Sequence, residues 1–96
     1  MTGTQRTSAE LDPRRRRILF RSWRRGTREM DLIMGGFADE NLRDFTEEEV
    51  EEFERIIEVL DLDLYRWING EEPVPAEYDT PLMRRLMAFQ AHTLLF

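Results

Sequence analysis

Apolar residues recur at helical spacing along most of this chain. After Thr46, the spacing places one apolar stripe along a helix: Val50, Phe53, Ile56, Ile57 and Leu60. A second set, at positions i, i+3, i+4 and i+7, consists of Met30, Ile33, Met34 and Phe37. No run of alternating β-branched residues predicts a strand. The pattern predicts an all-α protein, folded as a compact bundle of five short helices.

Start signals precede four of the expected helices. Asp12-Pro13 and Thr80-Pro81 each combine an N-cap residue with proline at the first helical position, and residues 46–49 form a capping box. Asp61 is expected to cap a short helix that Gly70 ends. A loop stiffened by two prolines then leads to the last helix.

Glycines interrupt the region around the first two helices. The first helix is expected to run through residues 13–25, where Gly26 ends it or bends it sharply. A second helix begins at Thr27, and we expect it to fray by about residue 38 or to continue only weakly, because Gly35-Gly36 and the segment after it weaken it.

The length of 96 residues fits one domain. We expect a flexible polar tail over residues 1–12 and a single helical domain over residues 13–96. The chain has no cysteine and one histidine, His92, which excludes disulfides, thiolate chemistry, Cys-based zinc sites and paired-histidine metal motifs. No apolar run approaches the roughly 20 residues that span a bilayer. We therefore expect a bacterial cytoplasmic protein without membrane insertion.

Charge is unevenly distributed along the chain, whose net charge is −6. Residues 1–30 carry nine arginines against three acids, whereas residues 31–79 carry seventeen acids against three arginines. The run Arg14–Arg17 could contact phosphate, so a small helical DNA-binding regulator that uses its basic first helix is the alternative function. Two observations argue against DNA binding. The pI is about 4.8, and the second helix has few polar side chains that could form hydrogen bonds with base edges. We expect no nucleic-acid partner.

Acidic and aromatic residues each suggest a site and also have a structural explanation. The acids of residues 47–54 could bind a metal, but acids at the start of a helix usually form a solvated face that its dipole favours. Four aromatic side chains could stack on a flavin ring, but at helical spacing they are expected in the core: Trp23, Phe53, Tyr65 and Trp67. No GxGxxG follows a strand, so no tightly bound FAD is predicted. No acid, base and nucleophile converge, so no enzyme is predicted.

The segment RRGTREMD, residues 24–31, resembles the RGxxE motif of the succinate dehydrogenase assembly factors that support flavinylation. Residues 30–42 resemble the helix that follows the motif in this family. Residues 60–75 resemble its Asp-Leu-aromatic-x-Trp stretch and the loop after it. The resemblance covers roughly residues 14–90. RGxxE alone is a weak pattern, but its order and spacing relative to the two later segments make the match specific.

The resemblance implies a five-helix fold without catalytic activity of its own. It implies binding to the FAD-loaded flavoprotein subunit of succinate dehydrogenase, with fumarate reductase as a second candidate client. The factor would hold that subunit in a state in which the subunit's own histidine attacks the flavin 8α-methyl carbon. FAD would thus be the client's cofactor, and the free factor is expected to be a monomer. The motif places Arg25, Gly26 and Glu29 at the contact surface, with Arg24 and Asp31 as neighbours.

The motif also has a plain structural explanation, which is a helix break followed by an ion pair between Arg25 and Glu29. Such an i,i+4 pair contributes only about 0.2–0.5 kcal/mol. Gly26 has a further use, because a residue without Cβ lets a partner's backbone approach closely. Arg25 and Glu29 could then make charge-assisted hydrogen bonds that fix the partner's orientation. At a helix junction, Gly26 is also expected to adopt a positive φ.

Overall fold

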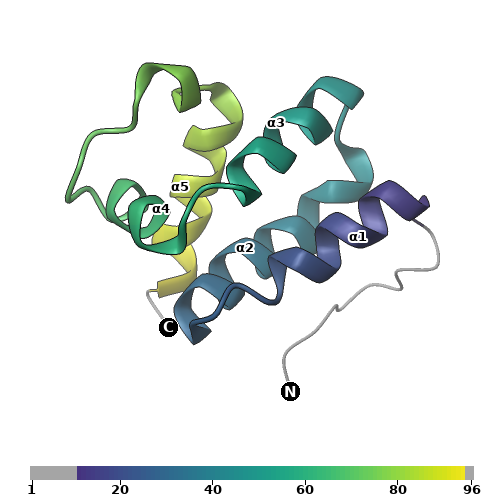
Figure 1. Cartoon of the computed structure of the whole chain (residues 1–96), viewed down its shortest axis with the longest axis horizontal. Helices are drawn as coiled ribbons and strands as arrows, with labels where there is room; N and C mark the ends of the chain where they lie inside the picture. Colours follow the sequence, from purple (N-terminus) through teal and green to yellow (C-terminus); the bar gives the residue numbers. More distant parts are fainter. Residues whose placement is uncertain (1–10, 95–96) are drawn as a thin grey trace.

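Five α-helices make up most of the described chain (Figure 1). The computed structural model describes residues 11–94, with side chains as far as residue 89. The helices are α1 (Pro13–Ser22), α2 (Arg28–Asn41), α3 (Glu47–Ile57), α4 (Asp61–Ile68) and α5 (Pro81–Leu94). Two short 3-10 helices, η2 (Leu42–Asp44) and η3 (Ala76–Tyr78), lie between them, and residues 11–94 contain no strand. The predicted all-α, five-helix fold is confirmed.

Helix α2 lies at the centre of the arrangement. It runs antiparallel beside α1 (Figure 1), and it also packs against α5. Its Phe37 is almost fully buried, with ring centroids 6.1 Å from Phe45, 5.8 Å from Phe53 and 5.7 Å from Phe89. Aromatic rings at these separations pack favourably, so this cluster joins α2, α3 and α5 in one core. Phe53 and Trp67 are buried as predicted, while Trp23 and Tyr65 are half-buried.

The predicted helix starts are confirmed with one exception. Asp12 accepts a hydrogen bond from the Arg15 backbone, Thr46 and Glu49 form the reciprocal capping box, and the Thr80 hydroxyl accepts from the Met83 backbone. The exception is Asp61, which is the first residue of α4 rather than its cap. The N-cap position is occupied by Leu60, which caps nothing through its side chain. The Asp61 carboxylate instead binds Arg25, as described below.

Leu60 also departs from the predicted apolar stripe. Its four companions on the stripe are buried, but Leu60 is 73% exposed. The expectation was wrong because α3 ends at Ile57, so the chain leaves helical geometry before Leu60. A residue beyond the end of a helix does not share the face set by the 3.6-residue period.

The diglycine segment does not end α2. The helix continues through Gly35 and Gly36 to Asn41, so the expected fraying near residue 38 was wrong. Tertiary packing explains the difference, because the Trp23 ring lies against Gly35 and the Phe89 ring against Gly36. Helix propensity is a weak preference that such packing overrides. Helix α1, in contrast, ends at Ser22, three residues earlier than predicted.

Some expectations fall outside the described residues. Residues 1–10 of the predicted tail and the side chain of His92 belong to this part of the chain, and the division into tail and domain stays a prediction. Within the described residues, none of the helices is both long enough and apolar enough to cross a membrane.

Candidate functional site

The predicted motif lies on the segment between α1 and α2, residues 23–27, which we call the connector. Gly26 has a φ of +110°, as expected for glycine at a helix junction. It is exposed, and a Cβ placed on it would meet only the Asp61 carboxylate, at 3.7 Å. The Thr27 hydroxyl then caps α2 by accepting a hydrogen bond from the Met30 backbone. At Gly26 the backbone of the connector is therefore exposed to solvent, with no side chain covering it.

The Arg25 side chain points into the molecule. Its Nη1 donates to the Ile57 carbonyl (2.6 Å), its Nη2 to the Val59 carbonyl (2.9 Å) and its Nε to Asp61 Oδ1 (2.7 Å). The side chain is only 8% exposed. Carbonyls at the end of a helix lack intrahelical partners, and the helix dipole favours a cation there. Arg25 therefore ties the connector to the junction between α3 and α4.

Asp31 binds the backbone of Arg25, while the acceptors described above bind its side chain. From the first turn of α2, its carboxylate accepts a hydrogen bond from the Arg25 backbone N–H at 2.5 Å. Arg25 forms its ion pair with Asp61, and Glu29 is left exposed on the surface of α2. The structure thus brings the five predicted residues together in two roles. Arg25 and Asp31 hold the connector, whereas Arg24, Gly26 and Glu29 face solvent.

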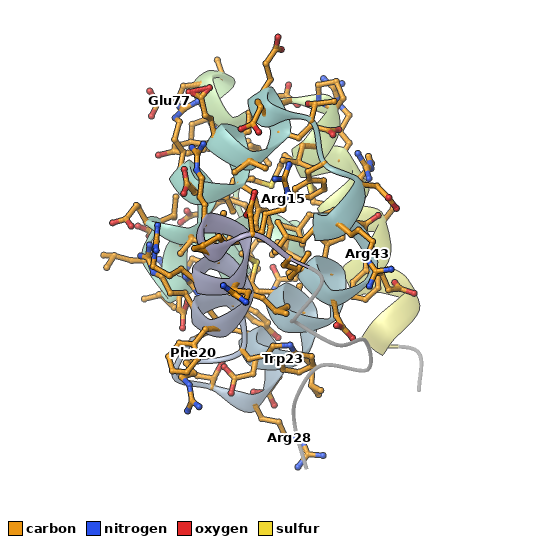
Figure 2. All side chains as sticks on the ribbon, turned by 90° about the vertical axis from the view of Figure 1, so that its right-hand side faces the viewer. Arg15, Phe20, Trp23, Arg28, Arg43 and Glu77 are labelled. Carbon is orange, nitrogen blue, oxygen red and sulfur yellow. The ribbon has the colours of Figure 1, made fainter. Side chains whose placement is uncertain are left out.

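Arg24 is stacked on an exposed aromatic ring. Its guanidinium carbon lies 4.2 Å from the centroid of the Phe20 ring, and Phe20 is 59% exposed. Figure 2 shows Phe20, Trp23 and Arg28 gathered at this end of the molecule. A cation held over an aromatic face is attracted by the ring quadrupole, so Arg24 is oriented on the surface.

A hollow of about 460 Å³ opens beside the motif, between the start of α2 and the start of α4. It is lined by Thr27, Glu29, Met30, Asp61, Leu62 and Tyr65. Leu62 is 60% exposed, and Leu60, just before α4, is 73% exposed. Concave, mainly apolar surfaces with a few polar groups are typical of binding sites. The sequence-based prediction missed Leu62 and Tyr65 as surface residues of this site.

The spacing of the leucines could have revealed Leu62 as a surface residue. Leu60, Leu62 and Leu64 alternate within a segment that is predicted to be helical. Residues two apart do not share a helix face, so all three leucines cannot be buried on one side. Leu64 is fully buried, and the other two face outward.

The described residues contain no group of three histidine, cysteine, aspartate or glutamate side chains placed to hold a metal ion. Some of the acids along α3 make other contacts. Glu49 closes the capping box and pairs with Arg85, and Glu54 pairs with Arg14.

Comparison with known proteins identifies the chain's relatives. The family model described as "flavinator of succinate dehydrogenase" matches residues 16–90. A "FAD assembly factor SdhE" of Acetobacter pasteurianus is 43% identical over 77 residues, which are 80% of this chain and 71% of that protein.

Mitochondrial proteins match over a similar stretch. "Succinate dehydrogenase assembly factor 2-A, mitochondrial" of Drosophila yakuba is 36% identical over 83 residues, covering 84% of this chain. "Succinate dehydrogenase assembly factor 2, mitochondrial" of Saccharomyces cerevisiae is 35% identical over 89 residues, covering 88%. The matches cover 51% and 55% of these two proteins, so this chain spans about half of their length.

All these relatives are named as assembly factors, not as enzymes, and none supports the DNA-binding alternative. The matched region contains the connector, the hollow, helices α2, α3 and α4 in full, and most of α1 and α5. The chain belongs to the family of flavinators of succinate dehydrogenase.

Proposed function

We propose that this protein is an assembly factor that binds the flavoprotein subunit of succinate dehydrogenase and promotes the covalent attachment of FAD to it. The observation that carries the proposal is the connector, which is anchored from inside by Arg25 and leaves Gly26 and Glu29 exposed beside the hollow. Family membership and the names of the relatives support the choice of client. Fumarate reductase is a second candidate client, and the bacterial cytoplasm is the proposed location.

The proposed contact surface combines backbone, charge and apolar area. Gly26 admits the client's backbone, while Glu29 and the stacked Arg24 supply charge-assisted hydrogen bonds. The hollow accepts an apolar side chain against Leu62 and Tyr65. Arg25 and Asp31 act on the client by keeping the connector in its shape. A preformed surface binds more tightly because little ordering is needed on association.

The proposed mechanism is selection of one conformation of the client. The new bond joins the client's own histidine to the flavin 8α-methyl carbon, and the factor contributes no reacting group. It needs only a higher affinity for the flavinylation-competent state than for other states, which shifts the client's population toward that state. The factor therefore acts without being an enzyme, and we propose that it binds its client as a monomer.

FAD is held by the client and not by the free factor. The hollow is open, and no dinucleotide-binding glycine motif accompanies it. Titration calorimetry of the isolated protein with FAD should give no saturable heat at micromolar concentrations. A stoichiometric binding curve would contradict this part of the proposal.

The decisive test is Gly26→Arg, compared with Gly70→Arg. Both glycines are exposed and have positive φ, +110° and +86°, so arginine introduces backbone strain at each, on the order of 1–3 kcal/mol. Gly70 follows the far end of α4, away from the hollow. A strain lacking the gene is complemented with each variant, and covalent flavin fluorescence and capture of the flavoprotein subunit are measured together with thermal melting.

We expect Gly26→Arg to abolish client capture and covalent flavinylation while the protein remains folded. Gly70→Arg should support both at the wild-type level. Equal losses in proportion to melting temperature would mean that Gly26 matters only for folding. Normal capture by a folded Gly26→Arg protein would end the claim that the motif is an interface.

A further inference from the structure

The Trp23 ring lies directly against the backbone of α2 at Gly35. A Cβ on Gly35 would lie 2.5 Å from Trp23 Cε3 and 2.6 Å from Cε2, distances that real Cβ atoms do not reach. Any side chain at this position would therefore displace the indole ring. The contact requires glycine for space rather than for an unusual φ, since Gly35 is an ordinary residue of α2.

Trp23 is the first residue of the connector and the C-cap of α1. Its backbone N–H donates to the Leu19 and Phe20 carbonyls, which fixes it to the end of that helix. The ring is half-buried, and its Nε1 is buried with no hydrogen-bond partner in the described structure. Packing against Gly35, and not a hydrogen bond, therefore determines where the ring lies.

The connector is thus attached to the protein body at both sides of Gly26. On the N-terminal side, Trp23 rests on α2 at Gly35. Arg25, on the same side of Gly26, reaches the α3–α4 junction, and on the C-terminal side Thr27 caps α2. A displaced Trp23 would move the start of a five-residue segment whose other anchors are fixed. The exposed backbone at Gly26 would shift as a result.

We propose that Gly35 is a positioning residue for client binding, which acts through Trp23 by setting where the connector leaves α1. This inference rests on the proposed function, because it assumes that the connector contacts the flavoprotein subunit. It predicts that the effect of a larger residue at position 35 on client affinity depends on the size of the side chain at position 23.

Gly36 provides a matched control in the same helix. A Cβ there would lie 3.1 Å from Cζ of Phe89, the far end of a side chain that needs to yield by only a few tenths of an ångström. Alanine is a better helix former than glycine, so helix propensity alone predicts that both Gly35→Ala and Gly36→Ala stabilise the protein. The geometry predicts opposite outcomes at the two positions.

The experiment compares Gly35→Ala, Gly36→Ala and the double variant Trp23→Leu with Gly35→Ala. A Trp67→Phe background makes Trp23 the one remaining tryptophan, so its fluorescence reports the position of the ring. The second measurement is affinity for the flavoprotein subunit. Gly35→Ala should shift the Trp23 emission and weaken capture roughly tenfold, whereas Gly36→Ala should change neither. The double variant should recover most of the affinity, because leucine leaves room for the alanine methyl.

Other outcomes would overturn the inference. These are normal capture by Gly35→Ala, lost capture with unchanged Trp23 emission, or a double variant as weak as Gly35→Ala. If Gly35→Ala fails to fold, the double variant decides: a folded, binding double variant supports the coupling, and an unfolded one overturns it. Failure of the wild-type protein to capture the flavoprotein would instead refute the proposed function, leaving the emission shift to test the packing.

Discussion

Two arginines from the first part of the chain bind α3, one through acidic side chains and the other through backbone carbonyls. Arg14 pairs with two acids on the side of α3, with Nη2 2.6 Å from Glu54 and Nη1 3.5 Å from Glu47. Arg25 meets its end, where it binds the carbonyls of Ile57 and Val59 together with Asp61. The side chain of Arg14 is 39% exposed, and that of Arg25 is 8% exposed.

The comparison shows why two arginine–carboxylate ion pairs contribute different amounts to the stability of the fold. Water competes for both charges of the Arg14 pair and screens their attraction, so such a surface pair adds little stability. Arg25 replaces water with three protein acceptors, two of which would otherwise be carbonyls without partners at a helix end. Its removal would leave those acceptors unsatisfied. Arg14 lies on the surface of the bundle and adds little stability, whereas Arg25 holds the connector in place.

The largest effect is expected from Arg25→Gln. Breaking a buried pair typically costs about 3–5 kcal/mol, and because Asp61 is 24% exposed we expect about 2–3 kcal/mol here. For a chain of this size this lowers Tm by about 8–24 °C. Client capture should fall even at temperatures where the variant is folded, because the connector loses its anchor. A small change in Tm would contradict the role assigned to Arg25.

An intermediate effect is expected from Asp61→Asn. The amide oxygen can still accept a hydrogen bond, and both carbonyl contacts of Arg25 remain, so the loss should be about 1–2 kcal/mol by thermal unfolding. Asp63→Asn is the matched control, because both acids lie in the first turn of α4 and interact similarly with its dipole. Equal losses in the two variants would show that the dipole, and not Arg25, accounts for the contribution of Asp61.

The smallest effect is expected from Glu54→Gln, with Glu51→Gln as control. The hydrogen bond from Arg14 lowers the pKa of Glu54 below its ordinary value of 4.5. A carboxylate with a lowered pKa stabilises the fold above its unfolded-state pKa, and this contribution is lost as pH falls through the folded-state pKa.

Glu54→Gln should therefore lower Tm slightly at pH 7 and make no difference well below pH 4.5. The decrease at pH 7 should be several-fold smaller than that of Asp61→Asn. It should vanish at about 1 M salt, where the Debye length is about 3 Å. If Glu54→Gln lowered Tm as much as Asp61→Asn, the ion pairs of Arg14 and Arg25 would contribute equally to stability, contrary to the comparison above.

The sequence by itself determined the helices and the motif. The five-helix fold followed from apolar spacing, and the starts at Asp12, Thr46 and Thr80 followed from capping chemistry, which depends on neighbours within four residues. The RGxxE resemblance identified the connector, and the glycine within it predicted the positive φ of Gly26. These features are local, so the residues nearby in the chain were enough to find them.

Only the tertiary structure decided how these parts meet. Arg25 lies 32 to 36 residues from its acceptors, so no local pattern could show that Asp61 binds it instead of capping α4. The continuation of α2 through its diglycine depends on Trp23 and Phe89, which come from other parts of the chain. The exposure of Leu60 depends on where α3 ends. For Arg25 and for the diglycine, the deciding contact joins different segments of the chain, where packing and burial outweigh local propensity.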